Sequence, residues 1–167
     1  IAGGVFAAPE SGGYGAVDPF IGTGGEGHTF PGAVVPFGMI QLSPDTQIKP
    51  RKEAYGWAAG YRYDDSTIVG FSHTHFSGTG HSDLGDVLLM PIAGEVRLER
   101  GDAAKPGSGY TSRFTHDDEI AQPGYYAVTL DDYGIRAGLT ASARVGVHRY
   151  TFPHGKPAHV LVDMRTS

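Results

Sequence analysis

Glycine and proline interrupt the apolar stretches of this sequence every few residues, and this constrains the fold more than any other feature. The chain has 26 glycines and 11 prolines in 167 residues, and average glycine usage is only about 7%. Between residues 17 and 50 each short apolar piece is ended by Gly or Pro before a helix could form. The sequence therefore predicts many short strands joined by tight turns.

The clearest strand signal is a hairpin near the C-terminal end. Tyr126, Val128 and Leu130 alternate with less apolar neighbours, the segment 131–134 (DDYG) has turn composition, and a return strand starts at Ile135. Further strands are predicted at residues 68–76, 86–97, 145–152 and 159–163, and the polar, Gly-rich segment 101–119 is predicted to be an exposed loop or an irregular edge.

Closely spaced strands without helical periodicity predict an all-β fold, an antiparallel β-sandwich, with a barrel as the alternative. The length fits one domain, which we place at residues 17–167. Residues 1–16 are Gly- and Ala-rich and are interpreted as a leader remnant or a flexible arm. Such a leader points to a periplasmic or secreted protein.

Charge and cysteine content exclude several classes of partner. The net charge is −5 without a basic run, so we expect neither nucleic acid nor an acidic membrane surface as a partner. No apolar stretch approaches the 18 or more residues of a membrane span. The chain has no cysteine, so a metal site here must use oxygen or imidazole ligands.

The densest polar cluster lies in the Gly-punctuated segment 70–86 (GFSHTHFSGTGHSDLGD). On a strand, His73 and His75 would point to the same face, as in cupin-like metal sites. That pattern also needs a Glu four or five residues later, where this sequence has Thr79 and Gly80. The alternative is that the imidazoles form hydrogen bonds within the protein and brace the loop.

A second Gly-rich segment, residues 18–32, surrounds Thr23, Glu26 and His28 with glycines. Its glycine spacing resembles that of a phosphate-binding loop. No helix follows it and no Lys-Ser/Thr ends it, so a nucleotide-binding role is not supported. A ligand-facing loop and a purely structural turn both remain open.

Three other features carry weaker signals. Trp57 is flanked by small residues, so both a core position and an exposed platform for a sugar fit it. The pair Asp64-Asp65 fits calcium binding or, better, a solvated turn. Asp83 and Asp86 have the residue type of a glycosidase acid and base, but sequence spacing does not fix the separation of their carboxyl groups.

Four long blocks in one order resemble the N-terminal β-sandwich domain of the calcium-dependent α-mannosidases of glycoside hydrolase family 92. The resemblance covers about residues 17–164 and leaves out the leader-like segment and the loop at 101–110. The blocks are DPFIGTGGEGHTFPGAVVPFGMIQLSPDT (18–46), GYRYDDSTIVGFSHTHFSGTGHSDLGDVLLMP (60–91), SRFTHDDEIAQPGYYAVTLDDYGIRAGLTASARVGVHRYTFP (112–153) and HVLVDM (159–164).

The resemblance implies a supersandwich-like domain packed on a C-terminal (α/α)₆ barrel, which we expect to be absent from this chain, with the active site at their junction. It implies exo-hydrolysis of terminal α-linked mannose, with α-1,2 as the expected linkage, from N-glycans or mannans. The reaction inverts configuration and is aided by a Ca²⁺ that binds two sugar hydroxyls. The acid, the base and most Ca²⁺ ligands are expected in the barrel, so we expect no catalytic residue here and an inactive isolated domain.

This domain is then expected to form one wall of the pocket. The alternative is a non-catalytic carbohydrate-binding sandwich. Two positions depart from the family pattern, His81 where a small or thiol residue is expected and Glu26 where His is expected, and they leave linkage preference open. A face that packs on a barrel should be apolar, so we expect self-association of the isolated domain. The candidate substrate-binding residues are Thr23, Glu26, His28, Trp57, His73, His75, Thr79, His81, Asp83 and Asp86.

Overall fold

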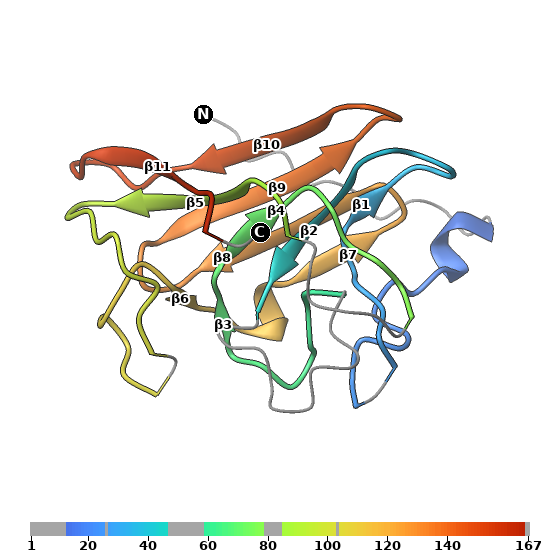
Figure 1. Cartoon of the computed structure of the whole chain (residues 1–167), viewed down its shortest axis with the longest axis horizontal. Coiled ribbons are helices and arrows are strands. Elements are labelled where there is room, and N and C mark those ends of the chain that lie inside the picture. Colours follow the sequence, from blue (N-terminus) through green and yellow to red (C-terminus); the bar gives the residue numbers. More distant parts are fainter. Residues whose placement is uncertain (1–12, 26, 47–58, 79–84, 103, 166–167) are drawn as a thin grey trace.

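Strands build nearly all of the regular structure in the computed structural model of the chain (Figure 1). It describes residues 13–25, 27–46, 59–78, 85–102 and 104–165. Within these ranges the only helical segments are two 3₁₀ turns, η1 (Gly13–Ala16) and η2 (His116–Asp118). Neither turn has the length or apolar character of a membrane span. The prediction of an all-β fold is confirmed.

The larger sheet has five antiparallel strands in the order β1-β2-β4-β5-β11. Its central strand pair joins Phe71 to Leu89, and β11 pairs with the whole of β5. The strands are β1 (Ala33–Val34), β2 (Gln41–Asp45), β4 (Gly70–Ser72), β5 (Leu88–Ala93) and β11 (Ala158–Asp163).

The second sheet is a four-stranded meander in the order β10-β9-β8-β7. It contains the predicted hairpin, with β8 (Tyr125–Leu130) and β9 (Ile135–Ala141) in register. Gly134 takes φ +65° and donates its N–H to the Leu130 carbonyl, a backbone conformation that favours glycine. The outer strands are β7 (Ile120–Gln122) and β10 (Gly146–Thr151).

The two sheets pack face to face and enclose one core, as a sandwich requires. On the meander, Tyr126, Val128 and Leu130 are fully buried and pair with buried Leu139, Ala137 and Ile135. The other sheet contributes fully or nearly fully buried side chains from β2, β4 and β5, namely Leu42, Phe71, Leu88, Met90 and Ile92. β9 contacts β1, β2 and β5 across this core, and the sandwich prediction is confirmed.

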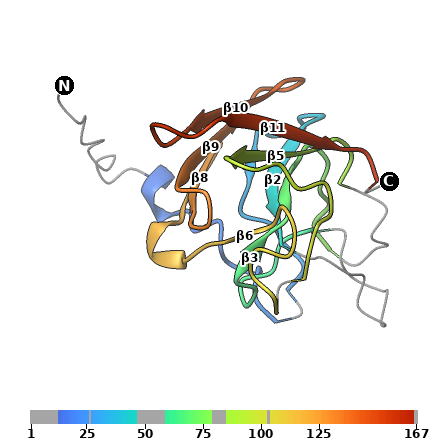
Figure 2. The ribbon, with the colours of Figure 1, turned by 90° about the vertical axis from the view of Figure 1, so that its left-hand side faces the viewer.

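The edge strands β10 and β11 lie side by side in Figures 1 and 2. They leave apolar side chains in solvent, with Val147 50%, Val160 49% and Val162 52% exposed. Exposed apolar surface favours association. Self-association of the domain stays a prediction.

One local expectation was wrong. The predicted strand 68–76 is split into β3 (Thr67–Ile68), which pairs with β6 (Ser112–Arg113), and β4, which ends at Ser72. His73 and His75 therefore follow a strand instead of sharing one face of it.

The segment 101–119, predicted to be an exposed loop or an irregular edge, contains the two-residue strand β6. It also contains the buried aromatic residues Tyr110 and Phe114, because each of these rings has a large apolar surface to bury.

Candidate functional site

The two Gly-rich segments that the sequence singled out lie against each other. The Gly78 N–H donates to the His28 carbonyl at 2.8 Å, which joins the 18–32 loop to the segment after β4. The loop itself is closed by Thr29, whose N–H donates to the Gly22 carbonyl at 3.2 Å. A side chain at Gly27 would collide with the Gly22 backbone, so the sequence must keep glycine there to close the turn.

Thr23 supports this loop from inside. It is 3% exposed, and its hydroxyl donates to the Phe20 carbonyl at 2.8 Å. Its own carbonyl accepts the Tyr63 N–H at 3.0 Å. These contacts favour a bracing role for Thr23 over the direct substrate contact that the sequence suggested.

Beneath Tyr63 lies a buried polar network centred on Glu119. The Tyr63 ring stacks on His116 with centroids 3.9 Å apart, and His116 Nδ1 lies 2.6 Å from Glu119. The same carboxylate accepts hydrogen bonds from the buried hydroxyls of Tyr61 and Tyr126. Burial and the Glu119 charge raise the pKa of both tyrosines, so they remain neutral donors. The network holds Tyr63, whose N–H donates to the Thr23 carbonyl, and so supports the 18–32 loop.

His75 is also buried, at 3% exposure, with protein partners for both ring nitrogens. Nδ1 lies 2.7 Å from the Gln41 carbonyl and Nε2 lies 3.0 Å from Asp45 Oδ1. Because a carbonyl only accepts, Nδ1 carries a proton. Gly60 at φ +70° packs against this pair, and a Cβ there would lie 2.8 Å from His75 Cδ2. These contacts favour a bracing role for His75, and its predicted contact with a sugar stays a prediction.

His73 belongs to a different chain of hydrogen bonds, which includes a histidine that the sequence analysis missed. His73 Nδ1 lies 3.2 Å from the Val87 carbonyl, its Nε2 lies 3.0 Å from His148 Nε2, and His148 Nδ1 lies 2.7 Å from the Tyr150 hydroxyl. The Val87 carbonyl can only accept, so His73 Nδ1 donates, and we assign the other two hydrogen bonds in the same direction. Tyr150 donates to His148, His148 donates to His73, and His73 donates to Val87.

His148 is neutral in this arrangement. Burial, together with the neighbouring His73, lowers the pKa of His148 to about 4, and burial raises the pKa of Tyr150. Alternation in β10, where His148 and Tyr150 share the half-buried face, was the signal that could have identified His148. We call His73, His75 and His148 the histidine cluster.

Strained backbone borders the histidine cluster. His28 and Val87 adopt φ +53° and +55°, a conformation that is unusual for any residue other than glycine and most unusual for a β-branched one. Their carbonyls accept from Gly78 and His73, respectively. Asp86, another predicted site residue, accepts from the Thr74 hydroxyl at 3.1 Å. Strain of this kind tends to persist at functional sites, which favours a functional role for this end of the sandwich.

The described residues do not assemble a metal site. Among them no group of three or more His, Asp or Glu side chains is arranged to hold an ion. Asp64 pairs with Arg62, and Asp65 accepts from Thr46, whereas Ca²⁺ needs six to eight oxygen ligands. The predicted site residues Glu26, Trp57, Thr79, His81 and Asp83 lie outside the described residues.

Comparison with known proteins places the chain among the glycosyl hydrolases. Residues 16–167 match the model of the glycosyl hydrolase family 92 N-terminal domain, and the chain therefore belongs to that family. This confirms the resemblance found in the sequence.

Among solved structures, a family GH92 alpha-mannosidase from Bacteroides thetaiotaomicron in complex with mannoimidazole is 48% identical, with a TM-score of 0.84 over 90% of this chain and 19% of its own. An inverting GH92 mannosidase from the same bacterium is 29% identical, with a TM-score of 0.70 over 94% of this chain and 20% of its own. An uncharacterized secreted glycosidase from Arthroderma benhamiae is 34% identical over 158 residues, 89% of this chain and 19% of that protein. The chain thus spans about a fifth of the length of these relatives.

Proposed function

We propose that this chain is the N-terminal sandwich of an inverting, calcium-dependent exo-α-mannosidase that removes terminal α-1,2-linked mannose from N-glycans or mannans. The observation that supports this most is the 48% identity to a GH92 alpha-mannosidase across nine-tenths of the chain. The likeness to an inverting mannosidase supports the stereochemistry. The likeness to a secreted glycosidase supports a secreted or periplasmic location.

In this proposal the surface around the histidine cluster forms one wall of the active site. Inverting glycosidases need a carboxylic acid and a carboxylate base on opposite faces of the sugar, with room for a water molecule. We infer that the remaining part of the enzyme supplies both groups and the Ca²⁺ ligands. Half-buried His73, whose ring nitrogens are held by His148 and the Val87 carbonyl, would shape this wall and position the backbone around it.

The division of labour is tested with the full-length enzyme and with this chain alone. Each is assayed on an aryl α-mannoside and on α-1,2-mannobiose, with Ca²⁺ and with a chelator. We expect hydrolysis only by the full-length, Ca²⁺-loaded enzyme. Hydrolysis by the chain alone would contradict the proposal, and binding to mannan without hydrolysis by either protein would favour the carbohydrate-binding alternative.

The role of the wall is tested with two histidine variants of the full-length enzyme. His73→Ala should lower kcat/KM about tenfold, because His148 and the Val87 carbonyl lose the partner that holds this wall in place. His154→Ala is the matched control, since His154 is exposed in the turn between β10 and β11. Equal activity of the two variants would show that His73 does not contribute to this wall of the active site.

A further inference from the structure

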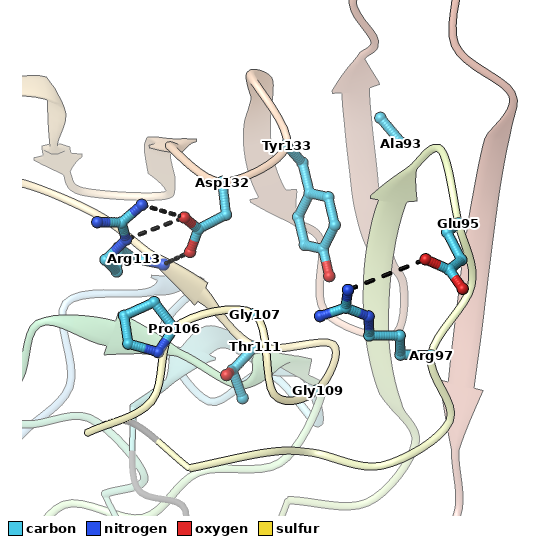
Figure 3. A pocket seen from close by; sticks show the side chains of 10 residues that line it. All are labelled: Ala93, Glu95, Arg97, Pro106, Gly107, Gly109, Thr111, Arg113, Asp132 and Tyr133. Carbon is cyan, nitrogen blue, oxygen red and sulfur yellow. Dashed lines mark hydrogen bonds and ion pairs between the residues drawn. The ribbon is translucent and has the colours of Figure 1, made fainter.

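A pocket with a volume of about 320 Å³ opens between the segment after β5 and the turn that joins β8 to β9 (Figure 3). Its polar groups come from Arg97, Thr111, Arg113 and Asp132, and the ring of Tyr133 forms one wall. Small-molecule sites range from about 300 to 1,000 Å³. The volume therefore suits one sugar ring. We call this the arginine pocket.

The arginine pocket lies at the other end of the sandwich from the histidine cluster. Strand β9 starts at Ile135, just after the pocket residues Asp132 and Tyr133, and at its far end its partner Gly146 packs against His73. At about 3.3 Å per residue, seven strand residues separate the two regions by roughly 20 Å. One sugar ring cannot contact both.

The charges of the arginine pocket are balanced. Arg113 is occupied by Asp132, which accepts from its Nε and Nη2 and also from its backbone N–H. These contacts with Arg113 outweigh burial and lower the pKa of Asp132, so that carboxylate is ionised. Arg97 pairs with Glu95 at 3.9 Å, the limit of an ion pair. Two positive and two negative groups favour a neutral ligand over an anion.

The remaining groups suit the two kinds of surface on a sugar. The Tyr133 hydroxyl donates its proton to the Tyr110 carbonyl at 2.9 Å, so its oxygen is left to accept from a ligand. The flat ring offers an apolar wall, while the Arg97 guanidinium beneath it points into the space (Figure 3). The Arg97 guanidinium can donate to sugar hydroxyls, and Asp132 Oδ2, which accepts one hydrogen bond from the Arg113 N–H, can accept another from a sugar hydroxyl.

We propose that the arginine pocket binds one ring of a neutral sugar, with Arg97, Thr111 and Asp132 as its polar contacts and Tyr133 as its apolar wall. The choice of a mannoside as the first probe rests on the proposed function, whereas the presence of a neutral-sugar site rests on the pocket alone. Such a site would hold a glycan chain on the enzyme at a second point along its length.

The test uses a fluorescent reporter at the rim of the pocket in the full-length enzyme. This chain has no cysteine, so Pro106→Cys, exposed at the rim, introduces one labelling position once any cysteine elsewhere in the enzyme is replaced by serine. The labelled enzyme is titrated with methyl α-mannoside, methyl α-glucoside, galacturonate and inorganic phosphate. We expect a saturable signal with a neutral sugar and none with phosphate.

Variants in this background identify the pocket as the source of the signal. Arg97→Ala should raise Kd about tenfold, because hydrogen bonds to charged groups are stronger than neutral ones. Thr111→Val keeps the side-chain shape and should raise Kd severalfold. Arg149→Ala, which removes the same charge from an exposed position on β10, should leave Kd unchanged.

Affinity electrophoresis of the unlabelled enzyme and variants in mannan gels gives an independent measurement. A signal from phosphate or galacturonate alone, no saturation by either neutral sugar, or equal Kd values for the Arg97 and Arg149 variants would each overturn the proposal. Hydrolysis is measured separately. A neutral-sugar signal in an enzyme that does not cleave mannosides would leave the pocket in place and reject only the proposed function.

Discussion

The histidine cluster and the arginine pocket lie at opposite ends of the same strands, but their polar groups are held in different ways. At the histidine end, the imidazoles of His73 and His148 are held by a carbonyl, a hydroxyl and each other, next to strained backbone. At the pocket end, the ionised carboxylate of Asp132 holds Arg113. The histidine end therefore depends on deprotonated His148, and the pocket end depends on a deprotonated carboxylate.

The two ends also differ in how exposed their polar side chains are, which distinguishes bracing residues from residues that a ligand can reach. His75 and Thr23 are each 3% exposed, and changing them would disturb the fold before it disturbed a ligand. Arg97 keeps 44% of its side chain exposed and can be changed at little cost to stability. Substitutions should therefore destabilise the protein most where carboxylates or glycines are buried.

The largest expected effect is at Asp163, where β11 pairs with the start of β5. Its carboxylate accepts from buried Tyr110 at 2.6 Å, from Arg100 and from Arg165. Asp163→Ala leaves the buried Tyr110 hydroxyl and the partly buried Arg100 without their partner, so the domain should lose about 3–5 kcal/mol of unfolding free energy. Denaturant unfolding measures this loss. Exposed Asp117→Ala is the control and should stay within about 0.5 kcal/mol of wild type.

The next largest effect is expected at Gly60, beside the Asp45–His75 pair. Gly60→Ala combines a positive φ with a collision against both side chains, and should destabilise by about 2–4 kcal/mol. Gly124→Ala has a similar φ, +75°, but open space around its Cβ, and should cost only about 1 kcal/mol. Thermal unfolding compares the two variants. Equal losses of stability in the two variants would mean that the Asp45–His75 pair moves aside for the added methyl group at little cost.

Acid should weaken the two ends in different pH ranges. The pKa of His148 is lowered from 6.5 to about 4 by burial and by His73, so the unfolded state binds a proton first as pH falls from about 6.5. The histidine end then loses stability between pH 6.5 and 4, by about 1–2 kcal/mol after allowance for solvent screening.

The pocket end should resist acid further, because the contacts with Arg113 outweigh burial and lower the pKa of Asp132. Asp163 should resist acid in the same way. Burial would raise the pKa of Asp163, but hydrogen bonds from Arg165, Tyr110 and Arg100 outweigh it and hold the pKa well below its usual value. Its contribution is therefore kept until the pH falls below about 4. Amide hydrogen exchange in β10 and in residues 110–113 at pH 7, 5 and 3.5 distinguishes the two ends. Simultaneous loss of protection would contradict this separation, and His148→Gln should remove the change between pH 6.5 and 4.

The sequence predicted the parts of the fold whose pattern is local. The β8–β9 hairpin, its turn and the sandwich class followed from alternation and turn composition, because each strand presents one apolar face to the core. The break after Ser72 and the buried Tyr110 did not follow. Both depend on partners far along the chain, β2 and β5 for one and Asp163 for the other.

The candidate site shows the same limit. The sequence identified which segments meet, but it could not separate ligand-facing from bracing side chains. Asp45, which partners His75, and His148, which partners His73, lie 30 and 75 residues away. The arginine pocket was missed because part of its lining lies within the segment 101–119, which had the composition of an exposed loop, and the rest comes from both sides of that segment.

The smallest expected effect has the opposite sign and concerns the strained residue next to the histidine cluster. Val87 is 39% exposed and sits at φ +55°, so Val87→Gly removes backbone strain without opening a cavity and should stabilise the domain by about 1 kcal/mol. The carbonyl that binds His73 then rests on a backbone with more freedom. We therefore expect a higher Tm together with a lower kcat/KM in the full-length enzyme. Val96→Gly, a similarly exposed valine without positive φ, should not raise Tm. If Val87→Gly raised Tm and left mannoside hydrolysis unchanged, the strain at the histidine end would belong to the loop alone and would not support a role of that end in binding.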